Sequence, residues 1–331
     1  MTTIDMHTHF FPESWPDLAE KFGTPDWPSI SHIEHGKAMI MLGDKPFRPI
    51  QSACWDTDLR LEKMDKDKID LQILCATPVL FSYPRPAEHA AEVAKIFNDA
   101  ALELCARGKG RLKAMCQVPL QDIDLACAEV SRAMDDGHIG VQIGNHVGLK
   151  NLDDEGIISF FAHCADIGAP ILVHPWDMMA RERMDKYMLQ WLVAMPAETQ
   201  LGLMSLILSG GFEKLPRTLK ICFAHGGGSF AYLLGRVDNA WRERDIVRED
   251  CPNPPSSYTD RFYVDSAVFD QGALNLLVDV MGADHVMLGS DYPFPLGEQN
   301  VGSLVRESSL DNQAKDCILG KTAEHFFDLE L

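Results

Sequence analysis

Short apolar segments alternate with longer amphipathic segments along most of the chain. The apolar segments are bounded by Gly, Pro or Asp, as is typical of parallel strands that helices cover on both faces. We predict strands at residues 3–9, 71–75, 112–118, 140–143, 171–174, 219–224, 262–265 and 286–290. Helical patterns lie between them, at residues 86–107, 125–136, 155–166 and 272–281 among others. This alternation predicts an α/β fold, a (β/α)8 TIM barrel, with a doubly wound open sheet as the alternative.

One segment near the start of the chain interrupts the alternation. Residues 12–60 are rich in prolines and turn residues, for example in Phe47-Arg48-Pro49. We predict an insertion after the first strand, built as a small hairpin and helix that serve as a lid. No long linker, internal repeat or low-complexity tract follows, so we interpret residues 1–331 as a single barrel domain that contains this insertion.

Composition and charge narrow the range of partners. The 331 residues are 46% hydrophobic and 24% charged, which excludes a disordered or fibrous chain. The net charge of −19 would repel a phosphate backbone, so we expect no nucleic acid partner. We find no signal peptide and no apolar run near the ~20 residues of a membrane span, and expect no membrane association. Nine scattered cysteines without a C-x-x-C pair predict a reduced, cytoplasmic protein.

Several predicted strands end in a residue that can bind a metal ion. His7 and His9 are two positions apart on the first strand, so their side chains point to the same face. His174, His225 and Asp291 each follow an apolar strand, where a single His or Asp is more typical of a hydrogen-bonded turn. In a barrel, however, the carboxyl ends of all strands surround one mouth. The five residues together therefore predict a metal site of three imidazoles and a carboxylate, with one His left over.

This constellation resembles the amidohydrolase superfamily, which has H-x-H on strand 1, His after strands 5 and 6, and Asp after strand 8. A resemblance to the aminocarboxymuconate-semialdehyde decarboxylase family within it extends from His7 to about Phe326 and is densest in the second half. It is carried by residues 141–146, 176–178, 194–199, 225–230, 235–237 and 289–298. The resemblance implies a non-oxidative decarboxylase that converts 2-amino-3-carboxymuconate 6-semialdehyde to 2-aminomuconate 6-semialdehyde and CO2. Either tryptophan catabolism or the breakdown of nitro- or aminobenzoates could supply that substrate.

The resemblance also implies a metal and a proton-transfer group. One Zn²⁺ per chain would be held by His7, His9, His174 and Asp291. His225 would be the catalytic acid/base that acts on the metal-bound water, with Asp291 beside it as a catalytic residue. Binuclear amidohydrolases often carry a Lys after strand 4, but residues 140–144 contain neither Lys nor Glu, which favours a single ion.

Four further residues take substrate roles by the same resemblance. Arg48 in the insertion would bind a substrate carboxylate, as guanidinium groups do through paired hydrogen bonds. Trp191 and Phe294 would wall the substrate pocket, although helical spacing also fits Trp191 as a packing residue. Arg236 would reach into the neighbouring subunit's site, so the working unit would be a homodimer.

The residues alone are also compatible with other functions. The runner-up is a metal-dependent hydrolase of a lactone or amide, and a related alternative is a decarboxylase of a hydroxybenzoate-type acid. A catalytically silent metal-binding protein is a third possibility. Residues 226–231 also fit the G-x-G-x-x-A dinucleotide pattern, but they follow the sixth strand rather than the first. We expect these glycines to let the backbone pass close to the pocket.

Overall fold

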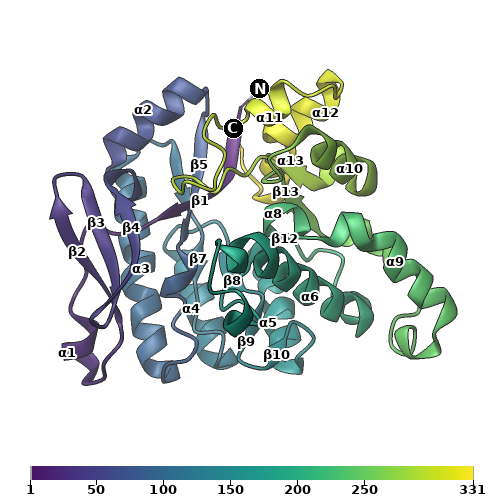
Figure 1. The fold of residues 1–331 in the computed structure, drawn as a ribbon, viewed down its shortest axis with the longest axis horizontal. Coiled ribbons are helices and arrows are strands. Elements are labelled where there is room, and N and C mark those ends of the chain that lie inside the picture. Colours follow the sequence, from purple (N-terminus) through teal and green to yellow (C-terminus); the bar gives the residue numbers. More distant parts are fainter. Residues whose placement is uncertain (1, 331) are drawn as a thin grey trace.

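The computed structural model describes residues 2–330, which form a closed barrel of parallel strands (Figure 1). Around the barrel the strands follow one another in chain order: β1 (Ile4–Phe10), β5 (Leu71–Ala76), β6 (Leu112–Ala114), β7 (Cys116–Gln117), β8 (Val141–Gly144), β11 (Ile171–His174), β12 (Ile221–Phe223), β13 (Tyr263–Asp265) and β14 (Val286–Met287). Strands β6 and β7 continue one another across Met115. The barrel closes where Met6 N donates to Leu288 O at 2.9 Å and His9 N to Tyr292 O at 2.7 Å. The predicted TIM barrel is therefore confirmed.

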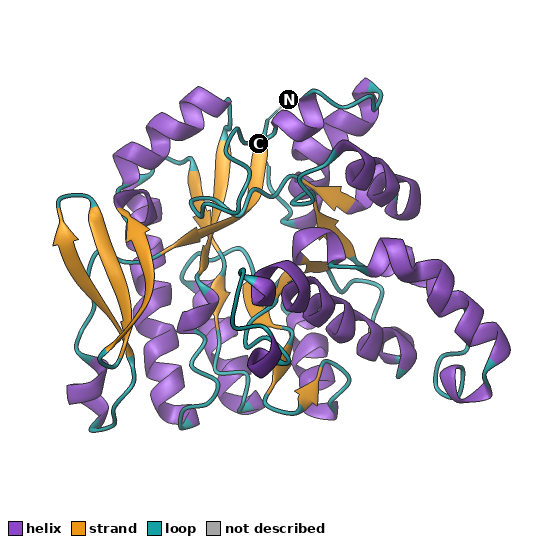
Figure 2. Cartoon of the chain, in the orientation of Figure 1, coloured by secondary structure: helices purple, strands orange, loops and turns teal. Residues whose placement is uncertain are grey.

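Helices surround the strands and account for the amphipathic segments of the sequence (Figure 2). The longer ones are α2 (Thr57–Asp67), α3 (Ala87–Arg107), α4 (Ile123–Asp135), α5 (Glu155–Asp166), α6 (Met195–Leu208), α9 (Phe230–Glu243) and α10 (Gln271–Met281). Several begin at an aspartate whose carboxylate accepts backbone N–H bonds of the first turn, as Asp56 does for α2 and Asp270 for α10. These caps stabilise each helix by about 1 kcal/mol and fix where it begins.

Shorter elements complete the described chain. They are α1 (Leu18–Phe22), β2 (Pro28–Glu34), β3 (Lys37–Leu42), β4 (Lys45–Gln51), β9 (His146–Val147), β10 (Lys150–Asn151), α7 (Gly211–Lys214), α8 (Ala224–Gly227), α11 (Ser303–Arg306), α12 (Asn312–Asp316) and α13 (Thr322–Phe326). The three glycines Gly226–Gly228, at the end of α8 and directly after it, have positive φ. A Cβ on Gly228 would lie 2.2 Å from the carbonyl oxygen of Pro196, so a larger residue could not fit at this close approach.

Two buried hydrophobic clusters hold the barrel together. The smaller one takes side chains from strands around the barrel, including Met6, Ile73, Leu172 and Met287, and it fills the interior below the strand ends. The larger one joins the outward-facing strand residues to the helices, as where Phe97 of α3 packs on the sheet. All nine cysteines are free thiols. This packed interior holds the carboxyl ends of the strands in fixed positions.

The insertion is a three-stranded antiparallel sheet with a short helix, rather than the hairpin and helix expected. Its strand order is β2-β3-β4, and it stands at the edge of the molecule beside α3 (Figure 2). Trp27, Ile40 and Ile50 anchor this sheet, because their side chains are buried in the larger hydrophobic cluster. Its role as a lid stays a prediction.

One helical stretch contradicts an expectation from the sequence. Residues Gln190–Leu208 run as a continuous helix, a π-helical turn followed by α6, and are long and apolar enough to cross a membrane by length and composition. The expectation that no such run exists is therefore wrong on this measure. Within the fold, α6 packs as a core helix with Leu203, Leu206 and Ile207 buried, and a core helix can meet the same criterion.

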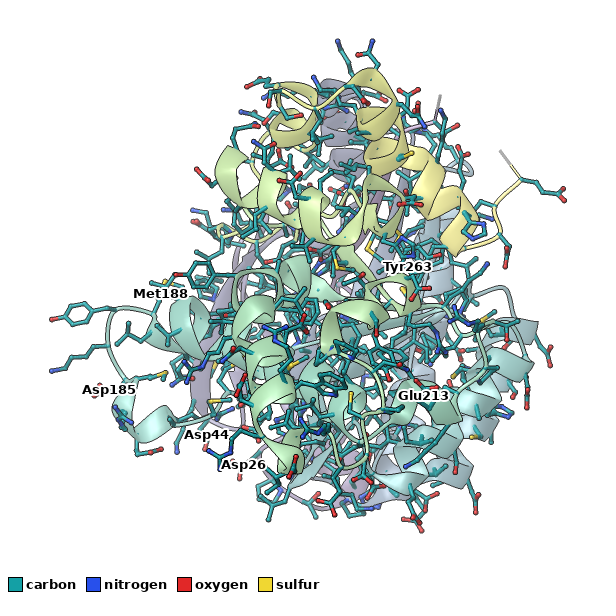
Figure 3. The ribbon with its side chains drawn as sticks, turned by 90° about the vertical axis from the view of Figure 1, so that its right-hand side faces the viewer. Asp26, Asp44, Asp185, Met188, Glu213 and Tyr263 are labelled. Atoms are coloured by element: carbon teal, nitrogen blue, oxygen red, sulfur yellow. The ribbon has the colours of Figure 1, made fainter. Side chains whose placement is uncertain are left out.

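Two regions stand away from the barrel. Helix α9 projects outward, and Phe230 is its one buried residue (Figure 1). Tyr232 on this helix is 81% exposed. The loop after β11 also protrudes, and Met188 and Asp185 lie on it (Figure 3). Both regions therefore carry aromatic or apolar side chains that remain exposed to solvent in the single chain.

Candidate active site

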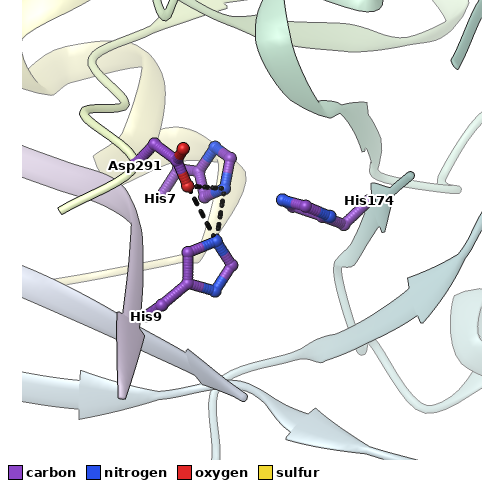
Figure 4. Close-up of side chains that lie close together, drawn as sticks. All are labelled: His7, His9, His174 and Asp291. Atoms are coloured by element: carbon purple, nitrogen blue, oxygen red, sulfur yellow. Dashed lines mark hydrogen bonds and ion pairs between the residues drawn. The ribbon is translucent and has the colours of Figure 1, made fainter. Parts of the chain in front are cut away.

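Four potential metal ligands from three strand ends converge in the barrel mouth (Figure 4). His7, His9, His174 and Asp291 each offer one nitrogen or oxygen atom, and these atoms all lie within 4.8 Å of one another. The three histidines are buried, and the side chain of Asp291 is 15% exposed. The structure thus brings together the four residues that the sequence proposed as a metal site.

The backbone explains how the four side chains meet. His7 and His9 lie on β1, where a register irregularity between Asp5 and Thr8 still leaves both rings facing the mouth. His174 is the last residue of β11. Asp291 follows β14 with a φ of 61°, a left-handed conformation that re-aims its carboxylate toward the β1 histidines. Its N–H also donates to His7 O at 2.9 Å, which ties the two segments together.

Hydrogen bonds at the outer ring nitrogens fix the tautomers. His7 Nδ1 lies 2.6 Å from Asp265 Oδ2, and His174 Nδ1 lies 2.8 Å from Pro175 O. An Nδ1–H that donates to these oxygens leaves the Nε2 lone pair facing the cluster. His174 Nε2 is buried and has no hydrogen-bond partner among residues 2–330. The histidines therefore present lone pairs to one another, an arrangement that a bound cation would stabilise.

The distances fit a single metal ion. His7 Nε2 and His9 Nε2 are 3.1 Å apart, and His9 Nε2 is 3.0 Å from Asp291 Oδ1. Ligands placed about 2.0–2.2 Å from a tetrahedral ion are roughly 3.3–3.6 Å apart, which lies between these two separations and the 3.8 Å from His7 Nε2 to Asp291 Oδ1. A set of imidazole nitrogens with one carboxylate oxygen suits zinc and other first-row divalent metals. The residues present therefore fit the implied metal.

The surroundings of His9, His174 and Asp291 favour the deprotonated forms that bind metal ions. Burial lowers the pKa of His9 and His174, so both rings are neutral near pH 7. Burial alone would raise the pKa of Asp291, but the hydrogen bond and charge of the histidines hold that pKa well below its usual range. Burial opposes protonation of His7 too, yet its bond to Asp265 raises the His7 pKa on balance. The carboxylate of Asp265 therefore counteracts the effect of burial on His7.

The fifth residue, His225, lies beside the four. Its ring centroid is 4.9 Å from that of His174 and 5.2 Å from that of His7. His225 has a φ of 55°, and its N–H donates to Asp265 at 3.0 Å, so the backbone holds the ring in the mouth. Burial lowers the pKa of His225, and its Nδ1 is buried without a partner among the described residues. A neutral ring in this place is able to accept a proton.

Asp265 is a site residue that the sequence analysis missed. It ends β13, and its carboxylate accepts bonds from His7 Nδ1 and from the N–H groups of His225, Gly226 and Ala267. Burial would raise its pKa, but these bonds, the bond to His7 above all, lower it, so Asp265 stays ionised. It orients both His7 and His225. The sequence signal was available, because Asp265 ends a predicted strand much as Asp291 follows one.

Three of the residues proposed to bind substrate also gather at the mouth. The Phe294 ring lies 5.3 Å from that of His9, and the Arg48 guanidinium lies 4.6 Å from the Phe294 ring centroid. Arg48 also lies 5.9 Å from the Trp191 ring. Burial lowers the pKa of Arg48, while the charge of Asp291 opposes this shift. The insertion thus delivers a cation, held among aromatic rings, to the edge of the metal cluster.

Arg236 does not join this group within one chain. It lies on the exposed surface of α9, and among residues 2–330 no hydrogen bond or ion pair links it to the cluster. Helix α9 projects away from the barrel (Figure 1), and Arg236 on it is exposed in the single chain. A contribution of Arg236 to an active site would require a second subunit.

Comparison with known proteins agrees with this geometry. The sequence profile of the amidohydrolase family matches residues 4–329. The chain is 40% identical to the 2-amino-3-carboxymuconate-6-semialdehyde decarboxylase of Dictyostelium discoideum, covering 99% of this chain and 92% of that protein. It is 32% identical to the enzyme of that name in Caenorhabditis elegans, covering 99% and 94%.

Solved structures show the same fold. The dihydroxybenzoic acid decarboxylase of Polaromonas sp. JS666, crystallised with manganese and the inhibitor 2-nitroresorcinol, superposes with a TM-score of 0.79. That alignment has 21% identity and covers 99% of this chain and 97% of the other. The profile match and the two full-length relatives show that this chain belongs to the amidohydrolase family, in the group of the 2-amino-3-carboxymuconate-6-semialdehyde decarboxylases.

Proposed function

We propose that this protein is a metal-dependent decarboxylase that converts 2-amino-3-carboxymuconate 6-semialdehyde to 2-aminomuconate 6-semialdehyde and CO2. One observation carries the proposal. The chain is 40% identical over nearly its whole length to a decarboxylase of that name, and its His7, His9, His174 and Asp291 converge within 4.8 Å at the barrel mouth. Dihydroxybenzoate is the second candidate substrate class, supported by the fold shared with the Polaromonas enzyme.

We further propose zinc as the resident metal. Three imidazole nitrogens and one carboxylate oxygen form a donor set that suits zinc, which would need one further position for water or substrate in a catalytic site. The Polaromonas structure contains manganese, so manganese is the alternative. When bound, either ion supplies Lewis-acid stabilisation and lowers the pKa of water.

The surrounding residues can be assigned to steps of the reaction. Decarboxylation breaks the carbon–carboxylate bond, releases CO2 and leaves an electron pair on carbon that must take up a proton. His225 is neutral and adjacent to the cluster, which suits it to take a proton from water and deliver it to that carbon. The Arg48 guanidinium can hold a substrate carboxylate through paired hydrogen bonds. Phe294 and Trp191 form apolar walls that position the conjugated chain and limit access of water.

The working unit is proposed to be a homodimer in which Arg236 enters the partner's site. Helix α9 carries Arg236 and the exposed Tyr232, and the loop after β11 exposes Tyr187 and Met188. Exposed apolar groups of this size are typical of surfaces that bind another protein. A second copy docked along α9 would cover them and place a second guanidinium near a dicarboxylate.

The test is direct. The purified protein is incubated with 2-amino-3-carboxymuconate 6-semialdehyde, and the ultraviolet band of the substrate and the CO2 released are measured together. We expect one CO2 per substrate consumed, loss of activity after treatment with a chelator, and recovery on adding Zn²⁺. Parallel reactions with dihydroxybenzoate and with a lactone serve as comparisons. CO2 from dihydroxybenzoate alone, or lactone hydrolysis without CO2 release, would contradict the proposal.

A further inference from the structure

A buried arginine lies directly behind the metal cluster. Arg60 of α2 is 1% exposed, and among residues 2–330 no carboxylate lies within ion-pair distance of it. Its Nη2 donates to His9 O at 2.6 Å and to Ala53 O at 3.2 Å. Its Nη1 donates to Thr8 Oγ1 at 3.3 Å and to Gln72 Oε1 at 3.1 Å. Burying an unpaired cation is costly, so these bonds call for an explanation beyond packing.

A buried carboxylate completes the arrangement on the other side. Asp5 of β1 is fully buried, and its carboxylate accepts from Ser290 N at 3.1 Å and from Ser290 Oγ at 2.7 Å. Gln72 Nε2 donates to Asp5 Oδ2 at 3.2 Å, while the oxygen of the same amide accepts from Arg60. One amide therefore bridges the buried cation and the buried carboxyl group of Asp5, and the hydrogen-bonded chain Arg60–Gln72–Asp5–Ser290 is continuous.

Both ends of this chain adjoin proposed metal ligands. Arg60 binds the carbonyl of His9, and Ser290 immediately precedes Asp291. Tyr292, on the other side of Asp291, donates its N–H to Ser290 Oγ at 3.1 Å, and its ring lies 4.9 Å from the Arg60 guanidinium. The unusual left-handed backbone of Asp291 is thus held from both sides, as a conformation that costs about 1–2 kcal/mol requires.

We propose that Arg60 is a positioning residue of the metal site. Through Gln72, Asp5 and Ser290 it fixes the spacing between His9 on β1 and Asp291 after β14. Through the carbonyl of Ala53 it also ties the end of the insertion to β1. The inference rests on the proposed metal site but not on the identity of the substrate.

The experiment measures metal affinity rather than turnover. Arg60→Met keeps an unbranched apolar stem but removes the guanidinium group with its charge and donors. We expect the Kd for Zn²⁺, measured by competition with a chelator, to rise about 10–100-fold, as is typical when a group that orients a ligand is lost. The visible spectrum of the Co²⁺-substituted protein should shift, because the ligand geometry relaxes. Arg60→Lys, which restores a charge and some donors, should recover part of the affinity.

A matched control is available in Arg261. Its guanidinium donates to the carbonyls of Phe212 and Leu215 and lies 5.4 Å from the Phe212 ring, but it stands at the amino end of the barrel. Arg261→Met should leave the Zn²⁺ affinity and the Co²⁺ spectrum unchanged, whatever it does to stability. If Arg60→Met does not fold, Ser290→Ala tests the other end of the chain, and we expect a smaller rise in Kd.

The outcomes separate this proposal from the function proposed above. A folded Arg60→Met protein, or a folded Ser290→Ala protein in its place, with wild-type Zn²⁺ affinity and Co²⁺ spectrum would overturn the positioning role. An equal loss of affinity in Arg261→Met would also overturn it, since the effect would then be general. Failure of the wild-type protein to decarboxylate the semialdehyde would refute the proposed substrate while leaving the affinity result intact.

Discussion

The histidines of this site differ in how their outer ring nitrogens are held. His7 and His174 have Nδ1 hydrogen-bonded to oxygen atoms, so Nε2 faces the cluster as a ligand. His225 is held by its backbone instead, and its Nδ1 has no partner among residues 2–330. His9 Nδ1 also has no partner among these residues, so the position of each ring, rather than its Nδ1 partner, separates the proposed ligands from His225, whose ring centroid lies 4.9 Å from that of His174. This difference can be tested one residue at a time.

Removing His225 should separate metal binding from turnover. We expect His225→Ala to keep its metal and to lose about 10²–10⁴-fold in kcat, because a proton-transfer group is lost. His174→Ala should lose both the metal and the activity. Metal content and kcat are measured on the same preparations, with His35→Ala in the exposed β2–β3 turn as the control. Loss of metal in His225→Ala, or its retention in His174→Ala, would contradict the assignment.

Asp265 should control metal affinity through His7. In Asp265→Asn the side chain keeps one oxygen for four donors, so His7 loses the bond that fixes its tautomer. We expect the metal Kd to rise about 10–100-fold. Asp270→Asn is the matched control, because Asn also caps a helix and Asp270 touches only the start of α10. Equal metal affinity in Asp265→Asn and the wild type would show that the bond has no such role.

At the scale of elements, the insertion brings a positively charged side chain to the mouth of the barrel. Strand β4 carries Arg48 to the rings of Phe294 and Trp191, while Trp27 and Ile50 anchor the small sheet in the core. The barrel supplies the metal ligands, and the insertion supplies the cation beside them. Their combination explains why a strand outside the barrel would influence substrate affinity.

Arg48 should act on substrate binding rather than on the metal. We expect Arg48→Ala to raise KM by about 10–100-fold, since a charge-assisted hydrogen bond contributes roughly 1.5–3 kcal/mol. The KM of Arg48→Lys should lie between those of the wild type and Arg48→Ala, because lysine keeps the charge but not the paired donors. Lys45→Ala, on the exposed start of the same strand, provides the control. The claim fails if Arg48→Ala leaves KM unchanged, or if its metal content falls.

The sequence predicted the elements of the barrel better than the details between them. Strand 171–174 and helix 155–166 agree with the structure residue for residue. The spacing of their hydrophobic residues and the turns beside them define both elements locally. The three-stranded form of the insertion was not predicted, since pairing among β2, β3 and β4 depends on contacts with the barrel core. Asp265 was missed for a similar reason: its hydrogen bonds join residues that are distant in sequence.

At the scale of the whole molecule, one chain leaves its surface incomplete. Helix α9 extends from the barrel with Tyr232 and Arg236 exposed (Figure 1), and the loop with Met188 also protrudes (Figure 3). An active site shared between two subunits would explain why α9 and this loop expose these side chains. The resemblance implied this role for Arg236, and a second subunit would have to supply the site that it enters.

Mixed dimers test this role. We expect Arg236→Ala and His225→Ala to be nearly inactive alone, but mixing the two chains should restore one complete site per mixed dimer. The His225→Ala chain then lends its Arg236 to the intact site of the other chain. Arg242→Ala, in the last turn of the same helix, should remain active by itself. Mixed dimers without any recovered activity, or a monomeric active enzyme, would contradict the shared site.

The central claim is that His7, His9, His174 and Asp291 bind one metal ion together. Anomalous diffraction from crystals of the purified protein tests it most directly. The account predicts one anomalous peak per chain, within about 2.0–2.2 Å of a ring nitrogen from each histidine and of an oxygen from Asp291. Two peaks in the mouth, or a single peak bound by other residues, would contradict it.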